Sequence, residues 1–253
     1  MPRYPHARTT SYSFGPGRLS PAIRALIIAN VAMFVVRIFF RGITNYLGLI
    51  PADLVEHFFV WQPFTYMFLH GSFFHILFNM LALWMFGTEL EWMWGTRYFL
   101  WYYFVTGLAA AATTVAVSLL PFNFADGIYY AATIGASGAI YGLLLAYGLY
   151  FPNRPIYLYL IFPIPAKYFV MLMGGIAFLS SASGAGGGIA HTAHLGGLVA
   201  GYLVLARGPT GGIRLSPWAE VKYRYLKWKL DRAKRRFGVY SGGRRDDWDR
   251  RIH

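Results

Sequence analysis

The stretch Ala131-Ala-Thr-Ile-Gly135-Ala-Ser137-Gly-Ala-Ile-Tyr141-Gly-Leu-Leu-Leu-Ala-Tyr-Gly-Leu-Tyr150 contains no Asp, Glu, Lys or Arg. Its length matches a helix that crosses the hydrocarbon core of a bilayer, which takes about 20 predominantly apolar residues. A serine and several glycines interrupt its apolar character. The stretch therefore predicts a membrane-spanning helix that carries a polar group into the bilayer.

The composition of the whole chain agrees with a membrane location. Of its 253 residues, 57% are hydrophobic and 13% are charged, against about 25% charged in an ordinary soluble domain. The net charge of +13 could indicate a nucleic-acid partner, but the mean hydropathy of +0.42 and the 19% of aromatic residues favour a membrane protein. The chain has no cysteine, which excludes disulfides, thiol nucleophiles and Cys-ligated metals.

Further stretches without charged residues define the other membrane spans. The longest of them, from 168 to 207, exceeds one helix and is divided by the Ser- and Gly-rich segment 180–188. The sequence therefore predicts an all-α membrane protein with six transmembrane helices. They lie near residues 22–40, 72–88, 98–120, 131–150, 166–182 and 189–206.

The distribution of basic residues predicts the orientation of these spans. If the N-terminal segment 1–21 and the basic C-terminal tail 207–253 are both cytoplasmic, all of the 23 Lys and Arg residues except Arg37 and Arg41 lie inside. This is the bias that the positive-inside rule describes. It accounts for the net charge without nucleic acid. We expect an integral multi-pass protein of a bacterial cytoplasmic (inner) membrane, with the core at 22–206.

Polar side chains occur inside three of the predicted spans, and all three spans begin on the outer side. They are His75 and Asn79, Ser137 and Tyr141, and His191 and His194. Counted from the outer helix ends, His75, Ser137 and His194 share a depth of roughly 6–9 Å at 1.5 Å per residue. Polar groups inside a membrane are costly and indicate function.

Helical phase predicts which of these groups meet. His194, Gly197 and Gly201 share one face of the last span, so its glycines permit a close helix approach. The fourth span offers a matching small surface, formed by Gly135, Gly138 and Gly142. Contact between the two helices would bring the His194 imidazole towards the Ser137 hydroxyl, as a nucleophile and its base require. His191 lies further from the glycine stripe.

Each of these signals has a simpler alternative. The segment Gly135-Ala-Ser137-Gly138 is also typical of helix packing, and a histidine in a span can be a proton relay, a haem ligand or a hydrogen-bonded core residue. His75, His191 and His194 could bind a metal, but no carboxylate lies at their depth to complete the site. We therefore expect no metal and no cofactor. The same shortage of acids predicts a Ser–His dyad in place of a triad.

Three segments together resemble the rhomboid intramembrane serine proteases. They read His70-Gly-Ser-Phe-Phe-His75-Ile-Leu-Phe-Asn79-Met, Gly135-Ala-Ser137-Gly138-Ala-Ile-Tyr141-Gly142 and Ala193-His194-Leu-Gly-Gly197-Leu-Val-Ala-Gly201. Gly87-x3-Glu91-x3-Gly95 and Trp61 are further matches. The resemblance covers about residues 22–206 and implies a six-helix rhomboid-like bundle.

The resemblance also implies roles for the polar residues. Ser137 would be the nucleophile and His194 the general base and then acid. His75 and Asn79, with the Ser137 backbone N–H, would form the oxyanion hole. Tyr141 would pack against the His194 ring in place of an acidic orienter. The substrates would be single-span membrane proteins in the bilayer, cut near the outer face; the sequence does not predict an oligomeric state.

Some features depart from this pattern or leave alternatives open. Many rhomboid proteases have Trp-Arg where this chain has Trp61-Gln62, so a charged anchor of the first loop is missing and the loop is expected to be less stiff. His70 is interpreted as a loop-packing residue. A rhomboid-like pseudoprotease that binds membrane helices is one alternative function, and a transporter is another.

Overall fold

The computed structural model describes residues 17–121, 123–158, 162–183 and 189–207, together with Tyr225, Leu226, Trp228, Lys229 and Arg232. The chain divides into two units, 1–212 and 213–253, and all elements described below belong to the first. Most of the predicted N-terminal segment 1–21 and almost all of the predicted tail 207–253 lie outside the described residues.

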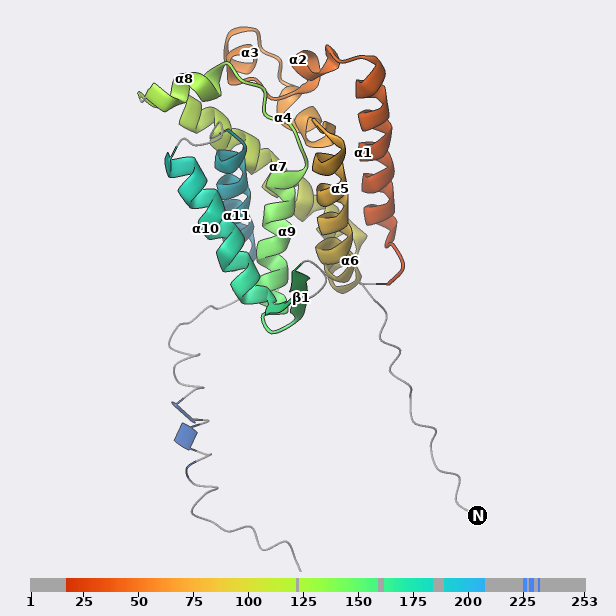
Figure 1. The fold of residues 1–253 in the computed structure, drawn as a ribbon, viewed down its shortest axis with the longest axis vertical. Coiled ribbons are helices and arrows are strands. Elements are labelled where there is room, and N and C mark those ends of the chain that lie inside the picture. The colour runs from red at the N-terminus through yellow and green to blue at the C-terminus, as the bar shows by residue number, and fades with distance from the viewer. Residues whose placement is uncertain are drawn as a thin grey trace, which may run out of the picture. The chain divides into compact units, whose positions relative to one another are not determined.

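Helices dominate the first unit, as the sequence predicts (Figure 1). The six that correspond to the predicted spans are α1 (Pro21–Phe39), α5 (Phe73–Ala82) continued through the π-helical turn η2 (Leu83–Gly87) into α6 (Thr88–Trp94), α7 (Thr96–Ser118), α9 (Ser137–Tyr150), α10 (Ala166–Ser183) and α11 (Ile189–Arg207). Three of these are long and apolar enough to cross a membrane, namely Pro21–Phe39, Phe73–Trp94 and Thr96–Ser118. The apolar helices α9 and α10 are shorter.

The core of the bundle lies where α7, α9 and α11 pack against one another. Helix α7 buries residues along most of its length, including Tyr102, Thr106 and Ala110. Figure 1 shows α5 and α1 on one side of α9, and α10 and α11 on the other. Helix α9 is thus surrounded by other helices, and almost all of its residues from Gly138 to Gly148 are buried.

Short elements close the two ends of the bundle (Figure 1). At one end lie α2 (Ile43–Leu47), α3 (Pro51–Glu56), α4 (Gln62–Thr65), the 3₁₀ turn η1 (Tyr66–Phe68) and α8 (Asn123–Tyr129). At the other end, β1 (Pro155–Leu158) and β2 (Phe162–Pro165) form an antiparallel hairpin in which Ile156 lies opposite Ile164. The hairpin was not predicted, because its strands are shorter than a periodicity can identify.

One buried carboxylate joins three helices at the hairpin end. Glu91 accepts hydrogen bonds from the backbone N–H groups of Ala22 and Ile23, at 2.9–3.2 Å, and from the hydroxyls of Ser20 and Thr96. It thereby satisfies the free N–H groups in the first turn of α1, where a negative charge also complements the helix dipole. Glu91 thus ties α6 to the first turns of α1 and α7.

Two glycines allow that arrangement. A Cβ at Gly87 would lie 2.5 Å from Ile23 Cδ1 and 3.3 Å from Phe99 Cζ, so the glycine leaves room for these two buried side chains of α1 and α7. Gly95 has a φ of +79° between α6 and α7, a conformation that other residues rarely adopt. The spacing Gly87-x3-Glu91-x3-Gly95 therefore forms one structural unit.

Candidate active site

Helix α9 begins at Ser137, later than the predicted start near 131. The preceding residues are held by backbone hydrogen bonds to the first loop: Thr133 and Leu49 exchange two N–H···O bonds of 2.8 and 3.0 Å, and the Gly135 N–H donates to the Tyr66 carbonyl at 2.9 Å. Gly135 has a φ of +122°, which a helix cannot contain. Ser137 therefore lies at the first helical position, where backbone N–H groups have no partner within the helix.

The side chains of Ser137 and His194 are in contact. His194 Nε2 on α11 lies 2.8 Å from Ser137 Oγ, a normal hydrogen-bond distance. Both side chains are partly buried. This is the geometry of a hydroxyl next to a base that can accept its proton.

Close packing of α9 and α11 brings the two residues together. A Cβ at Gly197 would lie 1.9 Å from the Gly138 carbonyl oxygen, and one at Gly201 would lie 3.2 Å from Gly142 Cα. Around Gly138, a Cβ would lie 2.6 Å from Ala110 Cβ on α7. Gly138 and Gly142 thus face Gly197 and Gly201 at backbone distance, whereas Gly135, predicted to belong to the same stripe, precedes α9 and lies beside His75.

We expect Gly197→Ala to destabilise the bundle by about 2–3 kcal/mol, because the added methyl meets backbone, which cannot move aside as a side chain can. The measurement is the midpoint of thermal unfolding in detergent. Gly175→Ala in α10 is the matched control, since nothing lies within 4 Å of its Cβ position. That variant should be neutral or more stable by up to about 1 kcal/mol. Equal midpoints for the two variants would contradict the packing argument.

The His194 ring is positioned by an aromatic ring. Tyr141 stacks on it with centroids 4.2 Å apart and planes 8° from parallel. Within the described part of the chain, the buried His194 Nδ1 has no hydrogen-bond partner. The stacked Tyr141 ring therefore restricts the imidazole where a triad would use an acid. The His191 ring meets that of His194 edge-on at 5.8 Å.

His75 and Asn79 occupy the first turns of α5. The position of a Cβ at Gly135 is 2.7 Å from His75 Nε2 and 3.8 Å from Ser137 Oγ, so the imidazole and the hydroxyl lie on the same side of Gly135. Asn79 Nδ2 donates to the His75 backbone carbonyl at 2.7 Å. An amide carries two N–H donors, so one of them is available to a ligand.

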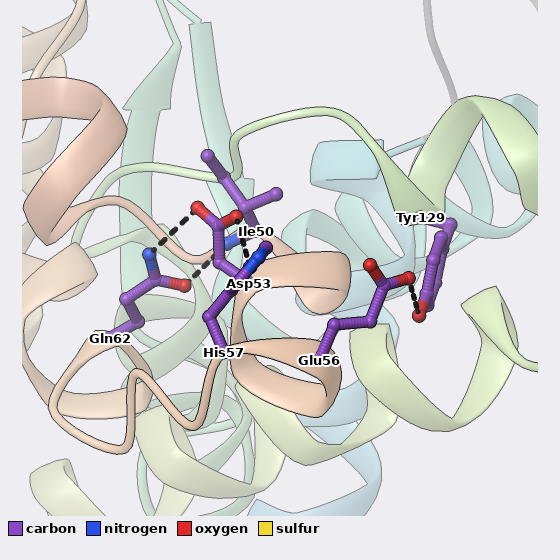
Figure 2. Close-up of polar contacts among 6 residues, drawn as sticks. All are labelled: Ile50, Asp53, Glu56, His57, Gln62 and Tyr129. Atoms are coloured by element: carbon purple, nitrogen blue, oxygen red, sulfur yellow. Dashed lines mark hydrogen bonds and ion pairs between the residues drawn. The ribbon is translucent and has the colours of Figure 1, made fainter.

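Gln62 anchors the first loop without a charge. Its side chain is completely buried; Oε1 accepts a hydrogen bond from the Ile50 N–H at 3.0 Å, and Nε2 donates to Asp53 Oδ2 at 3.4 Å (Figure 2). A guanidinium has no acceptor atom and could not bind Ile50 in this way. The amide thus supplies the loop anchor that the comparison with Trp-Arg sequences suggested was missing.

A second polar contact ties this loop to α8, the helix that precedes Ser137 along the chain. Tyr129 on α8 donates its hydroxyl hydrogen to Glu56 Oε1 on α3 at 2.8 Å (Figure 2). On the same short helix, His57 Nδ1 lies 3.5 Å from Asp53 Oδ1. The sequence does not reveal the contact between α3 and α8, because it joins segments that are more than 70 residues apart.

His70 is completely buried just before α5, with its ring 4.9 Å from that of His75. Burial, and then the neighbouring His75, lower the pKa of His70 to about 4. Among the residues that the structure describes, no hydrogen-bond partner reaches either ring nitrogen. A neutral packing residue fits this environment, as the sequence analysis interpreted His70.

This burial predicts a pH dependence of stability. Unfolding restores the ordinary pKa of His70, about 6.5. The unfolded state therefore binds a proton more strongly than the folded state. The free energy of unfolding is unaffected by His70 above pH 6.5 and falls as the pH drops from 6.5 towards 4. Between pH 7.5 and 5, His70 should account for a loss of about 2 kcal/mol. In His70→Leu, the midpoint of thermal unfolding should decline less over this range. An unchanged decline would contradict the assignment.

These contacts define a helical membrane protein with a serine–histidine pair at a helix N-terminus. A family model described as a rhomboid domain matches residues 57–208, more than half of the chain. The chain therefore belongs to the rhomboid family. With its long apolar helices, it is an integral membrane protein.

Curated relatives from several organisms are similar to this chain. Rhomboid protein 1, mitochondrial, of Saccharomyces cerevisiae is 34% identical over 139 residues, which cover 54% of this chain and 38% of the relative. Rhomboid protease GluP of Bacillus subtilis is 32% identical over 148 residues, or 58% of this chain and 25% of the relative. Rhomboid protease GlpG of Haemophilus influenzae is 33% identical over 146 residues, which cover 57% of this chain and 67% of the relative. The chain thus spans well under half the length of the first two relatives.

Proposed function

We propose that this protein is an intramembrane serine endopeptidase that acts through a Ser137–His194 dyad. The observation that carries the proposal is the 2.8 Å contact between Ser137 Oγ and His194 Nε2. Its setting supports it, because the hydroxyl stands at the N-terminus of a helix and the imidazole is stacked on Tyr141. The names of the relatives GluP and GlpG as rhomboid proteases agree with this class of reaction.

In the proposed mechanism, Ser137 Oγ attacks the carbonyl carbon of a peptide bond while His194 Nε2 takes its proton. The tetrahedral oxyanion is stabilised by the Ser137 backbone N–H, His75 Nε2–H and the Asn79 amide. His194 then donates the proton to the leaving amide nitrogen, and the C–N bond breaks to leave an acyl ester on Ser137. Water, deprotonated by His194, then attacks the ester carbon. The bond to Ser137 Oγ breaks, His194 returns the proton to Oγ, and the new carboxyl end of the substrate leaves.

The proposed setting is a six-helix core, 22–206, with segments 1–21 and 207–253 in the cytoplasm. The bias of basic residues supports this orientation and a bacterial cytoplasmic membrane. Ser137 then lies in the outer half of the membrane, because the N-terminus of α9 is directed towards the end of the bundle that holds α2, α3 and α8 (Figure 1). The substrates are single-span membrane proteins whose helices contain Gly or other weak helix formers near the cut, since the carbonyl must leave its helix to react.

The test is cleavage of a single-span model substrate by the purified protein in detergent, together with labelling by a fluorophosphonate. Cleavage and covalent labelling located at Ser137 by mass spectrometry are expected. Substrate binding without cleavage or labelling would instead indicate a pseudoprotease and overturn the proposal.

A further inference from the structure

Arg37 is one of two basic residues that the predicted topology leaves on the outer side, against the general bias. It lies near the end of α1, and two nitrogen atoms of its guanidinium donate hydrogen bonds. Nε donates to Thr44 Oγ1 at 3.0 Å, and Nη1 donates to the Gly71 carbonyl at 3.1 Å. Arg37 therefore connects α1 and α2 to the residue that precedes the N-cap of α5.

Gly71 in turn contacts His75. Its backbone N–H donates to His75 Nδ1 at 3.3 Å, while the His75 N–H donates to the Ser72 hydroxyl, the N-cap of α5, at 3.2 Å. The pattern is close to a capping box, in which the third helical residue reaches back to the residues before the helix. Both the backbone and the ring of His75 are thus held by the turn at Gly71 and Ser72.

The bond from Gly71 determines which ring nitrogen of His75 carries the proton. A neutral imidazole has one donor and one acceptor nitrogen. Because Nδ1 accepts from Gly71, the proton is on Nε2, the nitrogen that lies beside Gly135 and faces the same side as Ser137 Oγ. Only this tautomer presents a donor to an oxyanion formed at Ser137.

We propose that Arg37 is a positioning residue for the oxyanion hole. It holds Gly71 through a charge-assisted hydrogen bond, so that Gly71 keeps His75 in the Nε2–H tautomer and at the right angle. The planar guanidinium suits this task because it binds Thr44 and Gly71 at once, which the point charge of a lysine does less well. This inference rests on the proposed protease function.

The first test is kinetic. Arg37→Ala should lower kcat for the model substrate by about 10- to 100-fold with KM changed less than about twofold, since the contact acts on the transition state, and Arg37→Lys should recover part of the loss. Arg41→Ala is the matched control: Arg41 lies one turn further along and is exposed, so its loss should leave kcat unchanged. The double variant Arg37→Ala/His75→Ala should be no slower than His75→Ala alone.

The second test needs no activity. In ¹⁵N spectra of histidine-labelled wild-type protein, with His75 identified by its loss in His75→Ala, the ring should be protonated on Nε2, and Arg37→Ala should move it towards a mixture of tautomers. An unaltered His75 tautomer, or a loss of kcat that adds to that of His75→Ala, would overturn the inference. Failure of wild-type protein to cleave any substrate would instead overturn the proposed function.

Discussion

Replacing Ser137 by alanine is expected to lower kcat/KM for a membrane substrate by roughly 10⁴- to 10⁶-fold. In the proposed mechanism the Oγ atom forms the bond to the substrate, and no other hydroxyl among the described residues is hydrogen-bonded to His194 Nε2. His194→Ala should cost a similar factor, because an alcohol without a base is a weak nucleophile. The double variant should be no slower than either single variant, since the two groups act as a unit.

Matched variants separate this effect from general damage. Ser118→Ala removes a buried serine whose hydroxyl bonds the Val115 carbonyl of its own helix, and His191→Ala removes the histidine one turn from His194. Both should keep activity within about tenfold of the wild type. Comparable cleavage by Ser137→Ala and His194→Ala would refute the dyad.

Glu91→Ala should destabilise the protein by about 4 kcal/mol. The substitution leaves the N–H groups of Ala22 and Ile23 and the hydroxyl of Thr96 without their acceptor at a buried junction, and each unsatisfied buried donor costs about 1–3 kcal/mol. Glu91→Gln keeps one acceptor oxygen and should lose roughly half as much. The midpoint of thermal unfolding in detergent measures both.

The control for Glu91 lies two residues away. Glu89 forms an exposed ion pair with Arg154 at 2.9 Å, and exposed pairs contribute less than about 1 kcal/mol. Glu89→Ala should therefore unfold within a few degrees of the wild type. If Glu91→Ala were equally mild, the carboxylate would not be the junction between α1, α6 and α7 that its contacts describe.

The sequence predicts the helices well because a helix inside a membrane must consist mainly of apolar residues. A stretch without charges identifies each helix, and the phase of His194 and Gly197 predicts the face that meets α9. Both signals are local, so they can be read within one segment. The catalytic roles of Ser137, His194, His75 and Asn79 stay predictions until the variants are measured.

What the sequence does not show are backbone contacts between distant segments. The bonds between Leu49 and Thr133 and between Tyr66 and Gly135 use groups that every residue has, so no residue type reveals them. They explain why α9 begins at Ser137 and not near residue 131. The tie from Arg37 through Gly71 to His75 is missed for the same reason.

The exchange of bonds between Leu49 and Thr133 also makes the position of Ser137 less dependent on the segment that connects it to α7. Helix α8 lies between α7 and Thr133 in the sequence. The two backbone bonds to Leu49 hold Thr133 independently of the conformation of α8. We therefore expect Ser137 to keep its place even where the contact between Tyr129 and Glu56 is lost. The surface formed by α3 and α8 could then diversify without disturbing the Ser137–His194 pair.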